Sequence, residues 1–411
     1  MPTKRRRVFS FPAQTDLLSG AAFGGEACYA LDRKGWESGG GSRHQTSLPD
    51  TDKSRFLLSS YLGKPLGSSM SQEIEMSSQP SQVEQGPTAQ QISDRFSPLY
   101  EEFQQNDLWM KGERPLLAHY TSVETLEKIL KNEELWLSNP LFMNDLDEMR
   151  FGLTRGKAFF DQTDLEKTCG LDSATAALLR TDFNNLYSEY ESKHALNVYV
   201  LCLSMHAADN TDGILSMWRA YANNGAGAAV VFDTGAIKTL IDDSPLVLTQ
   251  VRYASTADRL QWLERKVADW CAIVAKGNIP QHMLYVPAYW LFHVILGFAL
   301  STKHIGFLEE HEWRLIYMPD RDRNKLLTEK FDYIVGSRGV EPKLKLKIAP
   351  LDGAISQFSF SEILHSILLG PSISSPLASA SVFRMLEKLN KEYLKSKVHS
   401  STIPLRHAWP I

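Results

Sequence analysis

The chain changes character near residue 92, and this change constrains its fold more than any other feature. Residues 1–92 are rich in Ser, Gln, Gly and Pro, as in SSMSQEIEMSSQPSQVEQGPTAQQ. Such a segment cannot bury enough apolar surface to offset the entropy lost on ordering it, so we expect a disordered tail. From residue 93 apolar residues recur at helix and strand spacings. The pattern predicts a single globular domain over residues 93–411.

Two features of the tail bear on its role. The run Lys4–Arg7 is typical of a solvated basic terminus, with a nucleic-acid or targeting patch as the alternative. Met70 opens a stretch richer in Gln, Ser and Glu than the residues before it. We expect that residues 1–69 are not translated or not needed, with the true start at Met70.

Composition places the rest among cytoplasmic globular proteins. Hydrophobic residues make up 43% and charged residues 22%, which allows a sizeable core. The net charge of -4 argues against a broad basic face for nucleic acid. The four cysteines form no CxxC pair, which indicates a reducing compartment without a structural zinc site. The apolar stretch 285–300 is shorter than the ~20 residues that span a bilayer, so it predicts a buried helix and no membrane segment.

Apolar periodicity predicts an α+β fold, a mixed β-sheet with packed helices. Short β-branched or alternating runs predict strands at 116–120, 135–138, 197–204, 228–232, 247–253, 312–317, within 327–350, and at 363–369. Helical spacing predicts helices at 123–130, 147–160, 173–194, 216–221, 256–276, 281–300 and 377–395.

Polar residues gather where the first predicted strand ends. His119, Tyr120 and Thr121 directly precede a predicted helix, whose free backbone donors favour an anion. A ribose or phosphate would fit there. A lone histidine is more often a buried, hydrogen-bonded one, but its polar neighbours favour binding.

A second group is acidic. Asn144, Asp145, Asp147 and Glu148 could ligate a hard cation. An acidic helix start, where Asn and Asp cap and Glu complements the dipole, explains them more simply. We therefore expect no metal.

Two further groups combine small, aromatic and charged residues. Ser204 closes a buried strand, and Trp218 and Tyr221 share a helix face, where they either stack on a flat ring or belong to the core. Glu310 and Glu312 alternate at the start of a strand and so share a face. Two such carboxylates need a nearby cation, which Lys303 or Arg314 could supply. A salt-bridged edge strand is the structural alternative.

These groups together resemble the bacterial domain-of-unknown-function 2971 family. The resemblance rests on HYTS and LWLSNP with ND-x(2)-E, CLS, MWRAY, VVFD, K-x(3)-F-x(2)-E-x-E-W-R-L-I, ILLGP and the closing residues 401–406. It covers about residues 96–411. Leu146 departs from the Pro that usually follows Asn-Asp in the family pattern.

The order of these groups is also similar to the ADP-ribosyltransferase fold. That resemblance implies NAD as the substrate, with His119 holding a ribose and Ser204 supporting the pocket. Trp218 or Tyr221 would stack on nicotinamide. Glu312 would be the catalytic carboxylate, and Glu310 would position the acceptor. The cofactor-binding set is completed by Tyr120, Thr121 and Arg314.

The resemblance predicts a cytoplasmic enzyme that ADP-ribosylates an unidentified macromolecule or hydrolyses NAD in a toxin or defence role. A fixed carboxylate would stabilise the oxocarbenium-like transition state, and no metal is needed. Glu312→Ala should then fold but lose turnover. Two alternatives stay open: a non-catalytic nucleotide- or protein-binding module, and a metal-dependent phosphodiesterase using Asn144, Asp145 and Glu148.

Overall fold

The computed structural model describes residues 86–104, 114–143, 146–237, 239–240, 244–322, 324–336, 339–351, 355–356 and 359–405. Contacts divide the chain into two units, residues 1–50 and 51–411, and all described residues belong to the second. The expectations about residues 1–85, Met70 included, and about Asn144 and Asp145 lie outside the described residues.

The described chain alternates helices and short strands. The helices are α2 Ala89–Phe96, α3 Pro98–Gln104, α5 Val123–Asn132, α6 Leu146–Gln162, α7 Leu165–Cys169, α8 Ser173–Glu189, α9 Leu215–Tyr221, α10 Thr256–Ala275, α11 Tyr285–Ser301, α12 Phe360–Ile363 and α13 Pro376–Lys388. The strands are β1 Leu116–Thr121, β2 Glu134–Ser138, β3 Tyr199–His206, β4 Ala228–Asp233, β5 Thr239–Leu240, β6 Leu246–Gln250, β7 Arg252–Ala254, β8 Thr302–His304, β9 Glu312–Tyr317, β10 Phe331–Gly336, β11 Gly339–Lys347, β12 Ile355–Ser356, β13 Leu364–Leu369 and β14 Val398–Ser400.

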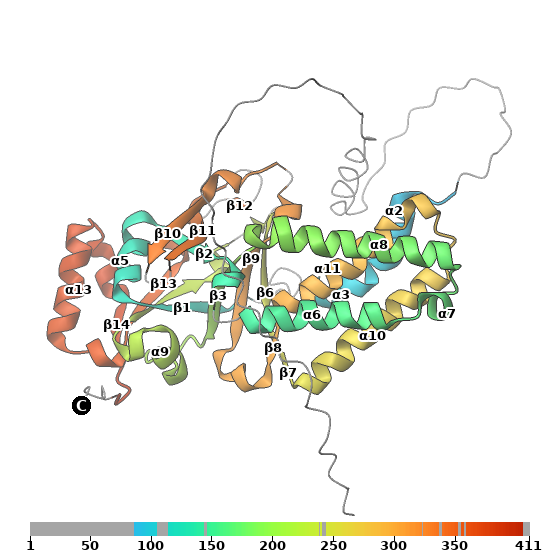
Figure 1. The fold of residues 1–411 in the computed structure, drawn as a ribbon. Coiled ribbons are helices and arrows are strands. Elements are labelled where there is room, and N and C mark those ends of the chain that lie inside the picture. Colours follow the sequence, from blue (N-terminus) through green and yellow to red (C-terminus); the bar gives the residue numbers. More distant parts are fainter. Residues whose placement is uncertain are drawn as a thin grey trace, which may run out of the picture. The chain divides into compact units, whose positions relative to one another are not determined.

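The strands form a large mixed sheet, which confirms the α+β prediction (Figure 1). Its order is β10-β11-β2-β3-β1-β4-β13-β14, and β9 pairs with both β3 and β6. Most pairs are antiparallel, but β13 and β14 run parallel. In the small sheet beside it β7 and β8 also run parallel. Of the antiparallel pairs among the described strands, only β10 and β11 are close in sequence, and the chain between the partners of each parallel pair contains helices.

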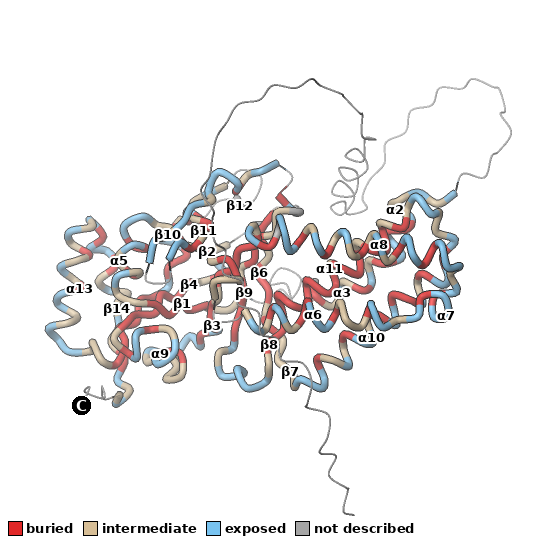
Figure 2. The backbone as a smooth tube through the Cα atoms, viewed as in Figure 1, coloured by how far each residue is buried: buried red, intermediate tan, exposed pale blue. Residues whose placement is uncertain are grey.

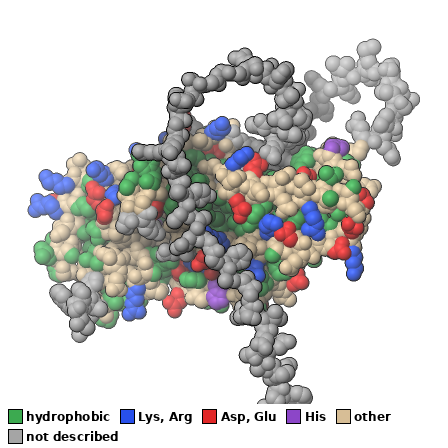
Figure 3. Space-filling model, in the orientation of Figure 1, with side chains coloured by type: hydrophobic (Ala, Val, Ile, Leu, Met, Phe, Trp, Pro, Cys, Tyr) green, Lys and Arg blue, Asp and Glu red, His purple; other side chains and the backbone are tan. Residues whose placement is uncertain are grey.

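Helices α2, α3, α6, α8 and α10 pack around α11, which is buried along most of its length (Figure 2). One segment of the described chain, Gln281–Ser301, is long and apolar enough to cross a membrane, and 78% of its most apolar window is buried in the protein. It is therefore a core helix, as predicted. On the face in view in Figure 3, acidic and basic side chains are interspersed over these helices.

Several boundaries differ from the sequence expectation, three of them for a clear local reason. Helix α2 starts at Ala89 with a capping box on Thr88, so ordered structure begins before residue 93. The expected strand 247–253 breaks at Val251, because β6 pairs with β9 and β7 with β8. The closing helix stops at Lys388, where Asn390 adopts the left-handed region with φ 56°.

The register of β1, β3 and β9 gives the sheet two different faces. Ala118, Ser204 and Glu312 lie side by side across the three strands. We call their side the polar face, which α9 and the helices around α11 cover. Residues one position along, such as Leu203 and Trp313, lie on the opposite apolar face beneath α5, α12 and α13.

Candidate functional site

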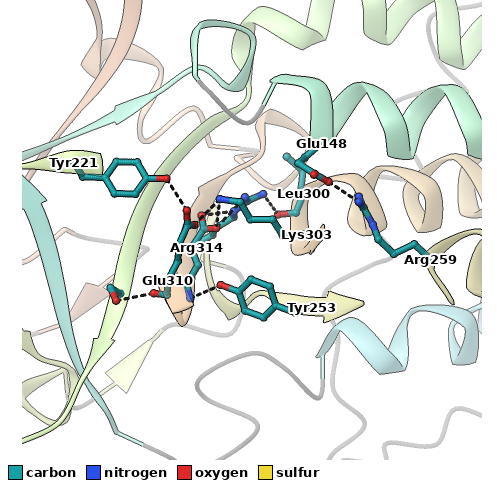
Figure 4. Close-up of polar contacts among 10 residues, drawn as sticks. Glu148, Tyr221, Tyr253, Arg259, Leu300, Lys303, Glu310 and Arg314 are labelled. Atoms are coloured by element: carbon teal, nitrogen blue, oxygen red, sulfur yellow. Dashed lines mark hydrogen bonds and ion pairs between the residues drawn. The ribbon is translucent and has the colours of Figure 1, made fainter. Parts of the chain in front are cut away.

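A buried group of ion pairs occupies the polar face where α9 meets the helices around α11 (Figure 4). Arg314 Nε lies 2.7 Å from Glu312 Oε1, and its Nη2 lies 3.2 Å from Glu312 Oε2. Lys303 Nζ lies 3.2 Å from Glu312 Oε2. These side chains are at most 5% exposed. We call Lys303, Glu310, Glu312 and Arg314 the ion cluster.

Glu310 forms the outer end of the ion cluster. Its Oε2 accepts a 2.6 Å hydrogen bond from Lys303 Nζ, and its Oε1 accepts a 2.8 Å hydrogen bond from Tyr221 Oη. Ser204 Oγ donates to the Glu310 carbonyl at 2.6 Å. The Glu310 side chain is 13% exposed against 3% for Glu312, so it is the carboxylate that meets solvent.

The two glutamates reach Lys303 from different local structures. Glu310 ends the 3₁₀ helix η7, Ile305–Glu310, and Glu312 starts β9. Between them His311 adopts the left-handed region with φ 42° and ends η7. Lys303, one of the two cations expected near this pair, contacts both carboxylates, but Glu310 lies in η7 and not in the strand, so strand alternation is not what brings them together.

Glu312 is held as an anion. Burial raises its pKa, but Arg314 and Lys303 more than offset this and lower it to about 2. The Cys202 thiol is also in hydrogen-bonding range. Burial raises the pKa of Tyr253, whose hydroxyl accepts a 2.7 Å hydrogen bond from the Glu312 backbone N–H. The carboxylate is therefore ionised at any physiological pH.

A neighbouring ion pair extends the charged region toward α10. Arg259 Nη1 lies 2.6 Å from Glu148 Oε2, and the guanidinium lies 4.3 Å from the centre of the Phe151 ring. Arg259 is 3% exposed. Arg259 was not expected from the sequence, because a buried arginine inside an amphipathic helix has the same spacing as a surface one. Tyr253 was not expected either, because only the tertiary fold brings its hydroxyl to the Glu312 backbone.

The structure does not bring His119 to the ion cluster. His119 pairs with Val230 on the apolar face, whereas Glu312 lies on the polar face, so an NAD pocket shared by the two is contradicted by the register. The pairing of β1 with β3 ends at Ala118–Ser204, and the His119 Nδ1–H donates to the Cys202 carbonyl at 3.3 Å. The ring thus ties the two strands where they diverge.

Tyr120, Thr121 and Trp218 belong to the core. Trp218 is 0% exposed, and its indole N–H donates to the Asp212 carbonyl at 2.8 Å. Tyr120 packs edge-on against it at 4.9 Å and accepts a 2.9 Å hydrogen bond from the Ile214 N–H. Thr121 is buried at the end of β1. Trp218 is therefore not available to stack on nicotinamide, and of the two aromatic residues only Tyr221 reaches the ion cluster.

The expected acidic group is only partly described. Asp147 and Glu148 lie in the first turn of α6, as expected for an acidic helix start. Glu148 also forms the ion pair with Arg259 of α10. Among the described residues no three His, Cys, Asp or Glu side chains converge in a way that could hold a metal ion. Because Asn144 and Asp145 lie outside that set, the phosphodiesterase alternative stays a prediction.

Comparison with known proteins matches one part of the chain. The family model described as "Protein of unknown function (DUF2971)" matches residues 217–315, which include Tyr221 and the whole ion cluster. No curated protein matches the chain. No solved structure matches it, so the similarity to the ADP-ribosyltransferase fold has no support from known folds.

Proposed function

We propose that the protein consumes NAD, cleaving the bond between nicotinamide and ribose and passing ADP-ribose to a macromolecule or to water. Glu310 is the carboxylate that contacts the substrate, and Glu312 is a positioning residue. The observation that carries the proposal is the difference in solvent exposure between Glu310 and Glu312. Both carboxylates share Lys303, but only Glu310 combines a firmly held geometry with exposure to solvent.

The chemistry needs a carboxylate that is already in place. As the C1′–N bond breaks, nicotinamide leaves with the bonding electrons, and positive charge develops on the ribose. A nucleophile then attacks C1′ and loses its proton. Lys303 and Tyr221 fix the Glu310 carboxylate by 2.6 Å and 2.8 Å hydrogen bonds. Fixed charge stabilises the cationic transition state without reorganisation at the moment of reaction.

The remaining residues support this carboxylate. Glu312 and Arg314 compensate each other in the interior, which keeps Lys303 in position. Ser204 holds the backbone of Glu310 rather than a ligand. Tyr221 places an aromatic ring beside the carboxylate, because its hydroxyl donates directly to Glu310. His119 has no role in this proposal.

Nicotinamide release from labelled NAD by the full chain, with a cell lysate as the source of acceptors, tests the proposal. Wild type is compared with Glu310→Gln, which keeps the shape but removes the charge. We expect Glu310→Gln to lower kcat by about a hundredfold or more. Glu264→Gln is the matched control, because Glu264 is an exposed glutamate of α10 outside the ion cluster and η7. Equal release by Glu310→Gln and wild type would overturn the assignment.

A second candidate is a binding module without catalysis. It is favoured by the nearly complete burial of Glu312, whose charge is compensated inside the protein. Such compensated clusters also occur as purely structural links between elements. Calorimetry of NAD binding separates the two: binding without nicotinamide release supports the module, and release that depends on Glu310 excludes it.

A further inference from the structure

Exposed apolar side chains gather on η7, directly outside the ion cluster. Ile305, Phe307 and Leu308 are 43%, 42% and 46% exposed. Most of the large apolar side chains of the described residues are buried or partly buried. Three exposed ones lie within four consecutive residues, and such local grouping of exposed apolar side chains is typical of interaction sites. We call these residues the η7 surface.

The η7 surface is tied to the ion cluster at both ends. Lys303, just before η7, donates to Glu310, its last residue. Tyr221 and Ser204 also hold Glu310 in place. The Lys303 Nζ lies 4.7 Å from the centre of the Phe307 ring. A partner on this surface would therefore lie next to the carboxylate that we place in contact with the substrate.

The charge around the η7 surface selects the partner. The segment IGFLEE contains two glutamates and no basic residue. Glu309 is exposed, and Glu310 reaches solvent. The adjacent Lys303 is 1% exposed and already shared by two carboxylates, so it is not available to a phosphate. Nucleic acid would need cations on η7, which has none, whereas a basic segment complements the exposed Glu309 carboxylate.

We propose that the η7 surface docks an apolar and basic segment of a protein, which is the macromolecular acceptor. That the docked protein is the acceptor rests on the proposed function, whereas the docking itself does not depend on turnover. Apolar side chains of the partner cover Ile305 and Leu308, and its basic side chains face Glu309. The docked acceptor then lies next to Glu310, the last residue of η7.

Fluorescence anisotropy on the full chain tests the docking with defined probes. The probes are a short synthetic Leu/Lys peptide, a Leu/Glu peptide of the same length and a single-stranded RNA. The test variant is Ile305→Ser with Leu308→Ser, since both side chains are exposed and apolar and supply no hydrogen bond to the ion cluster. The matched control is Tyr333→Ser with Val335→Ser, which removes apolar residues 60% and 74% exposed on β10.

We expect the Leu/Lys peptide to bind wild type at least about tenfold more tightly than the Leu/Glu peptide or the RNA. The η7 variant should lose about tenfold of this affinity, and the β10 variant should keep it. Preference for RNA, or equal affinity of the η7 variant and wild type, overturns the proposal. Unfolding curves confirm that both variants are folded.

Nicotinamide release measured on the same preparations keeps the two proposals apart. Intact peptide preference without any release means that the enzyme assignment fails while the docking surface stands. Release without peptide preference means the reverse. With both proposals right, the η7 variant keeps NAD hydrolysis but loses transfer to the Leu/Lys peptide.

Discussion

At strand β3 the two faces of the sheet carry opposite chemistry within a few ångströms of each other. The polar face holds Ser204, Glu312 and Arg314, each with a charged or hydrogen-bonding partner. The apolar face holds Leu201, Leu203 and their neighbours around a cavity of about 80 Å³, lined almost entirely by aliphatic and aromatic side chains. One face is specified by charge compensation and the other by packing, and the two should respond differently to mutation and to pH.

The comparison also shows that neighbouring residues of one strand can have quite different environments. His119 and Tyr120 are adjacent in sequence, yet they lie on opposite faces. Neither reaches the ion cluster: His119 links β1 to β3, and Tyr120 supports Trp218. A shift of one position in register would exchange their environments, because side chains alternate along a strand.

Glu312→Ala should have the largest effect on stability. Removing this carboxylate leaves the Arg314 charge buried without its bidentate partner and weakens the hold on Lys303, at a cost of about 3–5 kcal/mol. Urea unfolding measures the change. Replacing both Glu312 and Arg314 by Met should cost less than Glu312→Ala alone. If the single and double variants are equally destabilised, charge compensation does not specify the polar face.

Leu201→Ala probes the apolar face in the same way. Leu201 is 4% exposed and lines the cavity, so truncation should enlarge that space and cost about 2–5 kcal/mol. The same unfolding measurement, repeated from neutral to acidic pH, should give a constant difference from wild type. A difference that varies with pH would mean that the two faces are coupled.

The pH dependence of stability should come from the polar face. The pKa of Glu312 is lowered from 4.5 to about 2 in the folded protein, so its stabilisation is present above pH 4.5. It is lost as the pH falls toward about 2, and it amounts to about 3 kcal/mol. Denaturant unfolding across this window should show the loss in wild type and in Leu201→Ala. Glu312→Gln should lack this contribution, and an unchanged slope in that variant would contradict the assignment.

His119→Leu should have the smallest effect. It removes the donor to the Cys202 carbonyl and should cost about 1–3 kcal/mol, while NAD turnover persists because His119 lies on the opposite face from Glu310's partners. Burial lowers the pKa of His119, and its hydrogen bond to Cys202 opposes this. Stable protein without nicotinamide release would show that the faces are not separate in function.

Much of the fold follows from local patterns in the sequence. Helix spacing and β-branched runs predicted the α+β class, the buried helix α11 and most strand positions. The helix predicted from residue 123 starts there as α5, with Ser122 as its N-cap. The family resemblance expected over about residues 96–411 has the support of a family model over residues 217–315. These features are set by neighbours in the chain, so the sequence alone determined them.

Which residues meet in the ion cluster was decided by the tertiary structure. Local patterns identified Glu310, Glu312 and Arg314, and they named Lys303 as a possible cation. They could not separate these residues from His119 or Trp218, because strand register and helix packing join residues that lie far apart in the chain. Only the left-handed turn at His311 and the burial of Lys303 decide which carboxylate is the interior anion and which one meets solvent.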